Sequence, residues 1–160
     1  EMFEDHDEKP TRSLLFSLVT GMQMRGDAGS VYMDMPLNHK IFLAQFDTIR
    51  NVAAKGPCVI VGRCGDYVLR DEKKVVSVFI KADMEERKAR AVKYYNVDSA
   101  KAEEVIRKAD KQRASYYNYY TSKKWGDSRS YHLTLDSSVL GIDGCVDMIL
   151  ACREKMLEKK

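Results

Sequence analysis

Two short runs of apolar residues constrain the fold of this chain more than any other feature. The runs are CVIV (Cys58–Val61), which leads directly into Gly62 and Arg63, and VVSVFI (Val75–Ile80). Nearly continuous apolarity over so few residues is typical of strands that are buried on both faces, as in parallel sheets. We predict a strand in each run and a third strand in YHLTLD (Tyr131–Asp136).

Helical patterns alternate with these strands. Pro36 suits the first position of a helix, and Gly56 suits the end of the same helix. Asp98 or Ser99 suits the N-cap of the longest helix. We predict helices at residues 13–24, 36–55, 66–69, 83–96, 98–120 and 142–159. This alternation favours an α/β fold, a parallel sheet flanked by helices. Three strands are few for 160 residues, so we expect the sheet to contain a strand that these residues do not supply.

The composition sets limits on the class of protein. A chain of 160 residues suits a single domain over residues 1–160, and its hydrophobic fraction of 44% is typical of a globular protein. The net charge of +3 permits an anionic ligand but falls short of a dedicated nucleic-acid binder. The four cysteines form no CxxC pair, so we expect no metal site and free thiols. No apolar run is long enough for a membrane span, which predicts a cytoplasmic protein.

Gly62 and Arg63 stand where the first predicted strand gives way to a helix. In open parallel sheets, ligands bind beyond the carboxyl ends of the strands, and the N-terminus of a helix favours an anion. Arg63 is therefore a candidate anion-binding residue, and the alternative is a surface arginine that follows a turn. Cys64, at the same helix start, is predicted to be a small half-buried residue rather than a reactive thiol.

The longest predicted helix carries charge on its packing face. At about 100° per residue, Arg113 falls on that face and Asp110 lies at its margin. The other members of the face are Ala102, Val105, Ile106, Ala109, Tyr116 and Tyr120. A charge on a packing face is costly unless it is paired or bound to a ligand. We interpret the positive groups as holding phosphate, and the alternative is an Asp110–Arg113 pair with a purely structural role.

Three further segments carry weaker signals. The segment EERKAR places Arg87 and Arg90 at helical spacing, although such a charged face is usually solvated. The tyrosines of YYNYYTSKKW, with Lys123 and Lys124, have the character of a base-stacking surface, but we expect them to anchor their helix against its neighbours. The segment GMQMRGDA (Gly21–Ala28) lacks the lysine and the hydroxyl that a phosphate-binding loop requires, so we reject it as such a loop.

Together, four stretches resemble the cytidylate kinase-like family of P-loop nucleoside monophosphate kinases. They lie between Arg50 and the C-terminus and read VIVGRCGDYVL, VFIKADMEERKAR, IRKADKQRASYYNYYTSKKWGDSRSY and LTLDSSVLGIDGCVDMIL. The resemblance implies a three-layer sandwich in which residues 36–57 form a helix on the acceptor side and residues 97–130 form a lid. It also implies transfer of the γ-phosphoryl group of ATP to CMP, dCMP or a related acceptor, with Mg²⁺.

The resemblance also implies roles for individual residues. Arg113 and Arg107 would act on the transferring phosphoryl group as catalytic residues. Arg63 would hold the phosphate of the acceptor, and Asp110 would meet its nucleoside. The residues that would border ATP are Arg87, Arg90 and Ser137.

Two features depart from the family pattern. Cys64 follows Gly-Arg where cytidylate kinases usually have aspartate, which leaves the acceptor undefined. The opening strand and phosphate loop of the family would lie before Glu1, so we expect a natural protein with an additional N-terminal segment. A nucleotide kinase is the leading hypothesis. The alternatives are a catalytically inactive relative that senses a nucleotide or binds a protein, and a module that binds single-stranded nucleic acid.

Overall fold

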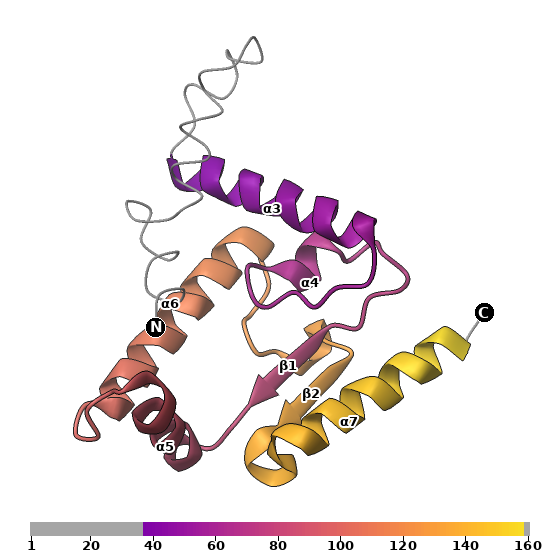
Figure 1. The fold of residues 1–160 in the computed structure, drawn as a ribbon. Coiled ribbons are helices and arrows are strands. Elements are labelled where there is room, and N and C mark those ends of the chain that lie inside the picture. Colours follow the sequence, from indigo (N-terminus) through magenta and orange to yellow (C-terminus); the bar gives the residue numbers. More distant parts are fainter. Residues whose placement is uncertain (1–36, 159–160) are drawn as a thin grey trace. The chain divides into compact units, whose positions relative to one another are not determined.

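The computed structural model describes residues 37–158 of this chain (Figure 1). These residues fall into two compact units, the first ending at Val68 and the second beginning at Leu69. The predicted helix at 13–24, Pro36 and the segment GMQMRGDA lie outside the described residues.

The first unit contains α3 (Leu37–Lys55) and the short α4 (Gly65–Val68), which contact each other. Ile41, Gln45 and Ile49 are buried at intervals of four residues, so one stripe of α3 turns away from water. Gly56 follows the helix with φ of 150°, a conformation that L side chains rarely adopt. Both helices confirm the sequence prediction to within a residue or two at their ends.

The strand predicted at residues 58–61 is not present, and that prediction was wrong. These residues form a loop in which the side chains of Val59 and Val61 are 93% and 88% exposed. A strand needs a neighbour for its backbone groups, and the two described strands, in the second unit, pair only with each other. The apolar residues of this segment are suited to a strand, but no described strand pairs with it.

The second unit is built on a two-stranded parallel sheet of β1 (Val78–Lys81) and β2 (Leu133–Asp136). The register pairs are Val78 with Leu133, Phe79 with Thr134, Ile80 with Leu135, and Lys81 with Asp136. β2 lies within the strand predicted at 131–136 and begins two residues later, whereas β1 begins three residues later than the strand predicted at 75–80 and ends one residue beyond it. The structure thus confirms a mostly helical α/β chain with a parallel sheet, although the sheet has two strands among the described residues rather than three.

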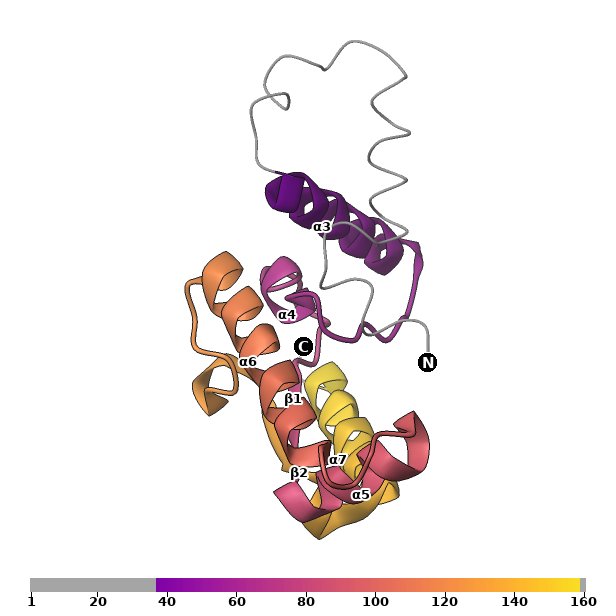
Figure 2. The same cartoon turned by 90° about the vertical axis from the view of Figure 1, so that its left-hand side faces the viewer.

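Two helices, α5 (Met84–Tyr95) and α6 (Ala102–Thr121), form the crossover between the strands and pack against each other (Figure 2). Asp83 precedes α5 and Asn96 ends it, as predicted, and Asn96 has the left-handed conformation. The cap predicted for α6 at Asp98 or Ser99 was wrong. The Asp98 carboxylate accepts a hydrogen bond from the backbone N–H of Ala100 (3.0 Å), so it closes a turn just before the helix.

The last helix, α7 (Ser137–Glu158), lies against both strands (Figure 1). Gly141, with φ of 68° and ψ of 179°, interrupts its first turns, and the helix predicted from residue 142 corresponds to the part after this break. Cys145 is buried, whereas Ile142 and Val146 are largely exposed, so the apolar residues of α7 are only partly covered. Within residues 37–158, no helix has the length and apolarity that a membrane span requires.

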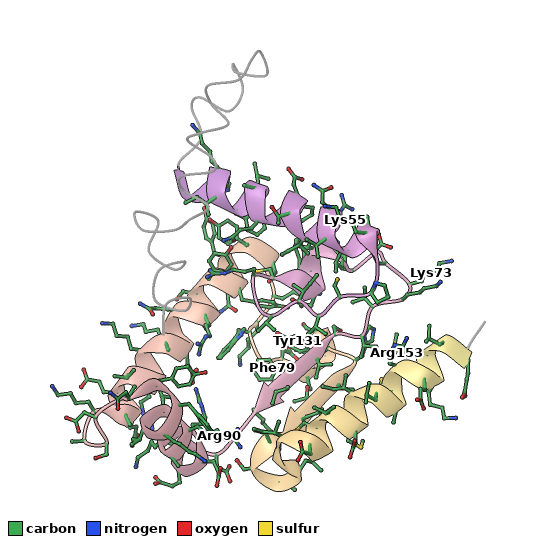
Figure 3. All side chains as sticks on the ribbon, viewed as in Figure 1. Lys55, Lys73, Phe79, Arg90, Tyr131 and Arg153 are labelled. Atoms are coloured by element: carbon green, nitrogen blue, oxygen red, sulfur yellow. The ribbon has the colours of Figure 1, made fainter. Side chains whose placement is uncertain are left out.

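Aromatic side chains connect the end of α6 to β1. The Phe79 ring lies 5.3 Å from that of Trp125 and 5.2 Å from that of Tyr131, between centroids, and Figure 3 shows Phe79 and Tyr131 beside β1. Tyr117 is buried and stacks on Tyr131. These contacts support the expected anchoring role. They also correct the predicted packing face of the helix, because Tyr117 belongs to it and Val105 is largely exposed.

Candidate functional site

The candidate site lies where β1 and β2 end. In a parallel pair, both carboxyl ends lie at one edge of the sheet, which is where α/β proteins bind ligands. Here β1 is followed by Asp83 and α5, and β2 is followed directly by Ser137 and α7 (Figure 1). The strand ends and the first turns of these two helices therefore bring their polar residues together.

Lys81 and Asp136, the last residues of the two strands, form an ion pair of 2.8 Å between Nζ and Oδ2. The hydrogen bond from Lys81 is the main cause that holds the pKa of the Asp136 carboxyl below its ordinary value. The same bond raises the pKa of the Lys81 ammonium. The backbone N–H of Ser138 donates to Asp136 Oδ1 (3.0 Å), and the Ser138 Oγ accepts from the N–H of Asp83 (2.7 Å). The two strand ends are thus joined by a charged, hydrogen-bonded network.

Ser137 and Arg90, both predicted to border ATP, are in direct contact. Arg90 donates to Ser137 Oγ (2.9 Å) and to the Ser137 carbonyl (3.2 Å), and Figure 3 shows its side chain on the side of α5 toward the start of α7. The buried Ser137 hydroxyl donates in turn to the Lys81 carbonyl (3.1 Å). Glu86 also lies near Arg90, at 3.5 Å. One hydroxyl therefore links β1, α5 and α7.

A second pair of predicted residues, Arg87 and Asp110, forms a two-bonded ion pair between α5 and α6. Arg87 donates from both terminal nitrogens to the two Asp110 oxygens, at 2.8 and 2.7 Å. Arg113, one turn farther along α6, lies 3.8 Å from the same Asp110 oxygen that Arg87 contacts at 2.7 Å. All three side chains are partly exposed, at 29%, 25% and 40% for Arg87, Asp110 and Arg113, so a solute can reach them.

Arg107 pairs with a different carboxylate. Its guanidinium donates to Glu103 at 2.8 Å, one turn earlier on α6, and its side chain is 68% exposed. An exposed pair at this spacing on one helix contributes a few tenths of a kcal/mol to stability. The structure brings Asp110 together with Arg113 and Arg87, and it shows Arg107 paired with Glu103 instead.

Arg63 belongs to the first unit and lies in a tight turn. Gly62, Arg63 and Cys64 all have positive φ, at 71°, 51° and 55°, and the Gly65 N–H donates to the Gly62 carbonyl (3.0 Å). Because residues 58–61 are a loop, Arg63 does not follow a strand among the described residues, and the strand-end argument for it no longer applies. Cys64 is buried, more than the half-buried state predicted. This burial raises the pKa of its thiol to about 12, as expected of an unreactive cysteine.

Sequence reasoning missed three members of the network at the strand ends, Lys81, Asp136 and Ser138. The signal was present, because Asp136 is the last residue of one predicted strand and Lys81 directly follows the last residue of another. Polar residues at the carboxyl ends of parallel strands are the ones that meet at the ligand-binding edge.

The charge of these residues fits an anionic ligand better than a metal ion. Among residues 37–158, no group of three or more His, Cys, Asp or Glu side chains has the arrangement of a metal site. Asp110 and Asp136 already have cationic partners. The arginines are groups suited to phosphate.

Comparison with known proteins decides the family. The sequence profile of the cytidylate kinase-like family matches residues 1–139. The chain belongs to the cytidylate kinase-like family. The match includes residues 1–49, which carried no resemblance in the sequence reasoning, and it ends near the start of α7.

A solved structure is similar to this member of the cytidylate kinase-like family. The crystal structure of an uncharacterized protein from Eubacterium ventriosum is similar to this chain at 34% sequence identity with a TM-score of 0.69. The similarity covers 73% of this chain and 74% of the other. A comparison with curated proteins found no match.

Proposed function

We propose that this cytidylate kinase-like protein transfers the γ-phosphoryl group of ATP to a nucleoside monophosphate, with CMP and dCMP as the first candidates. The observation that carries the proposal is the gathering of Arg87 and Arg113 around Asp110, in the unit that also holds Arg90 and Ser137 at the strand ends. Phosphoryl transfer depends mainly on positioning and on neutralising phosphate charge. Arginine side chains are suited to both tasks, because their planar forks bind phosphate oxygens in pairs.

Individual roles follow from the family. The contacts of Arg87, Arg113 and Arg90 support three of them, whereas the roles of Arg107 and Arg63 rest on the family alone. Arg113 acts on the transferring phosphoryl group, and Arg107 assists it. Arg87 and Arg90 contact ATP. Ser137 holds Arg90 in place beside the nucleotide. Arg63 binds the phosphate of the acceptor. When ATP is bound, it supplies the phosphoryl group, and the chain supplies the cations that orient and neutralise it.

The proposed fold is the three-layer sandwich of the P-loop kinases. The two-stranded parallel sheet and its flanking helices support this assignment, since α5 and α6 connect parallel strands and α7 covers them. Residues 97–130 are the proposed lid, which includes α6 and the aromatic anchor at Trp125. Residues 36–57, which include α3, are the proposed helix on the acceptor side.

A coupled assay tests this function. The protein is incubated with ATP and CMP, dCMP, UMP or AMP, and ADP formation is followed. We expect turnover that depends on one of these acceptors, and a loss of about a hundredfold or more in Arg113→Ala, since removal of one charge-stabilising donor typically costs that much. Glu85→Gln is the control, because Glu85 pairs with Lys88 on α5 outside the proposed site. Absence of turnover with all four acceptors would contradict the proposal.

A catalytically inactive, nucleotide-sensing relative is the second candidate. One observation favours it: Cys64 stands where cytidylate kinases usually have aspartate. Titration calorimetry separates the candidates. A sensor binds ATP or a monophosphate with measurable heat while the coupled assay shows no ADP, whereas a kinase shows both.

A further inference from the structure

The Asp110 carboxylate is placed between two arginines that come from different parts of the chain. Arg87 extends from α5 and Arg113 from α6, and both approach Asp110 Oδ1, at 2.7 and 3.8 Å. Two guanidinium groups repel each other when they are close, and a carboxylate between them offsets that repulsion. The position of Asp110 thus allows two cations to lie within reach of one small anion.

The geometry at Arg87 also fixes its orientation. Both terminal nitrogens of the guanidinium donate to the two carboxylate oxygens, at 2.8 and 2.7 Å, in the planar fork-to-fork arrangement. Such a pair holds the plane of the guanidinium and not only its charge. A guanidinium carries five N–H donors, and this pair uses two of them, so three point away from Asp110.

The net charge of Arg87, Arg113 and Asp110 favours binding of an anion. Arg87 and Arg113 contribute two positive charges and Asp110 one negative charge, which leaves a net charge of one positive unit on the three partly exposed side chains. An arginine that is already oriented binds phosphate without the cost of ordering a long flexible side chain. The group is therefore suited to a phosphate chain that approaches from solvent.

We propose that Asp110 is a positioning residue, whose carboxylate orients Arg87 beside Arg113 so that both guanidinium groups meet the same phosphate of the nucleotide. This role differs from the contact with the acceptor nucleoside that the family resemblance implies. It rests on the proposed phosphoryl-transfer function, because it assumes that the two arginines bind nucleotide phosphate.

Binding of tripolyphosphate tests this role without requiring catalysis. The dissociation constant is measured by titration calorimetry for the unmodified protein, Asp110→Asn, Arg87→Ala and the double variant. We expect each single variant to weaken binding by about tenfold, the effect of losing one ordered side chain. The double variant should bind no more weakly than Arg87→Ala, since Asp110 acts through Arg87. Asp110→Glu, which keeps the carboxylate, should recover most of the affinity.

A swapped pair separates positioning from structural support. The variant Arg87→Asp with Asp110→Arg keeps an ion pair between α5 and α6 and keeps the net charge, so it preserves the support for folding. Its arginine projects from the other helix, and we expect binding at least tenfold weaker than in the unmodified protein. Glu85→Gln, which removes a carboxylate from the exposed pair with Lys88, should bind as the unmodified protein does.

Several results would overturn the role of Asp110. They are unchanged or tighter binding in Asp110→Asn, losses that multiply in the double variant, full affinity in the swapped pair, or no binding of tripolyphosphate by the unmodified protein. Failure of this role can be distinguished from failure of the proposed function. If tripolyphosphate binding depends on Asp110 as described while no acceptor is phosphorylated, the kinase proposal fails and the positioning role is supported.

Discussion

At the scale of single residues, Ser137 shows how much one small side chain can organise. Its hydroxyl accepts from Arg90 and donates to the Lys81 carbonyl, and it is buried while doing so. A buried hydroxyl with both partners satisfied orders the groups around it, and its removal leaves those groups without a partner. Ser137 therefore connects the end of a strand to a cation that we assign to ATP.

Replacement of this hydroxyl gives a prediction about stability. We expect Ser137→Ala to lower the free energy of unfolding by about 1–3 kcal/mol, because the Lys81 carbonyl loses its donor and Arg90 loses an acceptor. Urea denaturation measures the change. Ser138→Ala is a comparison at the neighbouring position, where the lost hydroxyl accepts from the Asp83 N–H at an exposed site, and a smaller loss is expected. Equal losses in the two variants would contradict the assigned importance of Ser137.

At the scale of elements, local signals predicted the helices better than the sheet. The ends of α5 were predictable because Asp83 and Asn96 have intrinsic preferences for helix ends. The loop at 58–61 was not predictable, because a strand depends on a neighbouring strand that the local sequence does not reveal. For the same reason, helical spacing raised the pairing of Asp110 with Arg113 as an alternative, whereas the contact of Asp110 with Arg87, on another helix, required the structure.

The aromatic anchor of α6 depends on a glycine. Gly126 has φ of 76°, and a Cβ at this position would lie 3.2 Å from the Phe79 ring. We expect Gly126→Ala to destabilise the protein by about 1–3 kcal/mol, through backbone strain and displacement of the ring. Gly62→Ala is the matched control, since Gly62 has φ of 71° but open space around it. Urea denaturation of both variants measures the difference, and a loss in Gly126→Ala no greater than in Gly62→Ala would show that contact with Phe79 is unimportant.

At the scale of the whole molecule, many charged side chains form ion pairs in the folded chain. The net charge of the sequence is +3, yet many of its carboxylates and cations are engaged with each other. Arg129 lowers the pKa of Asp127 to about 2, chiefly by a side-chain hydrogen bond, and Lys81 lowers that of Asp136. These pairs therefore make the stability of the fold depend on pH in the acid range.

The direction of this pH dependence follows from the lowered pKa values. A carboxyl with a lower pKa in the folded state than in the unfolded state stabilises the fold above its unfolded value of 3.8, and this contribution is lost as pH falls toward the folded value of about 2. We expect the urea midpoint to fall through this range. In Asp127→Asn the urea midpoint should fall less steeply with decreasing pH, because one of the contributing carboxyls is absent. An equally steep fall in that variant would contradict the assignment.

The ion pair between Lys81 and Asp136 has a consequence for how the strands align. These residues are register partners at the ends of β1 and β2. A slip of one residue would turn one of the two side chains to the opposite face of the sheet and separate the charges. The pair therefore destabilises misaligned strands. Because Asp83 and Ser137 follow the strands within two residues, correct alignment also positions the first turns of α5 and α7. Strand alignment and the placement of polar residues at the carboxyl edge of the sheet therefore depend on the same ion pair.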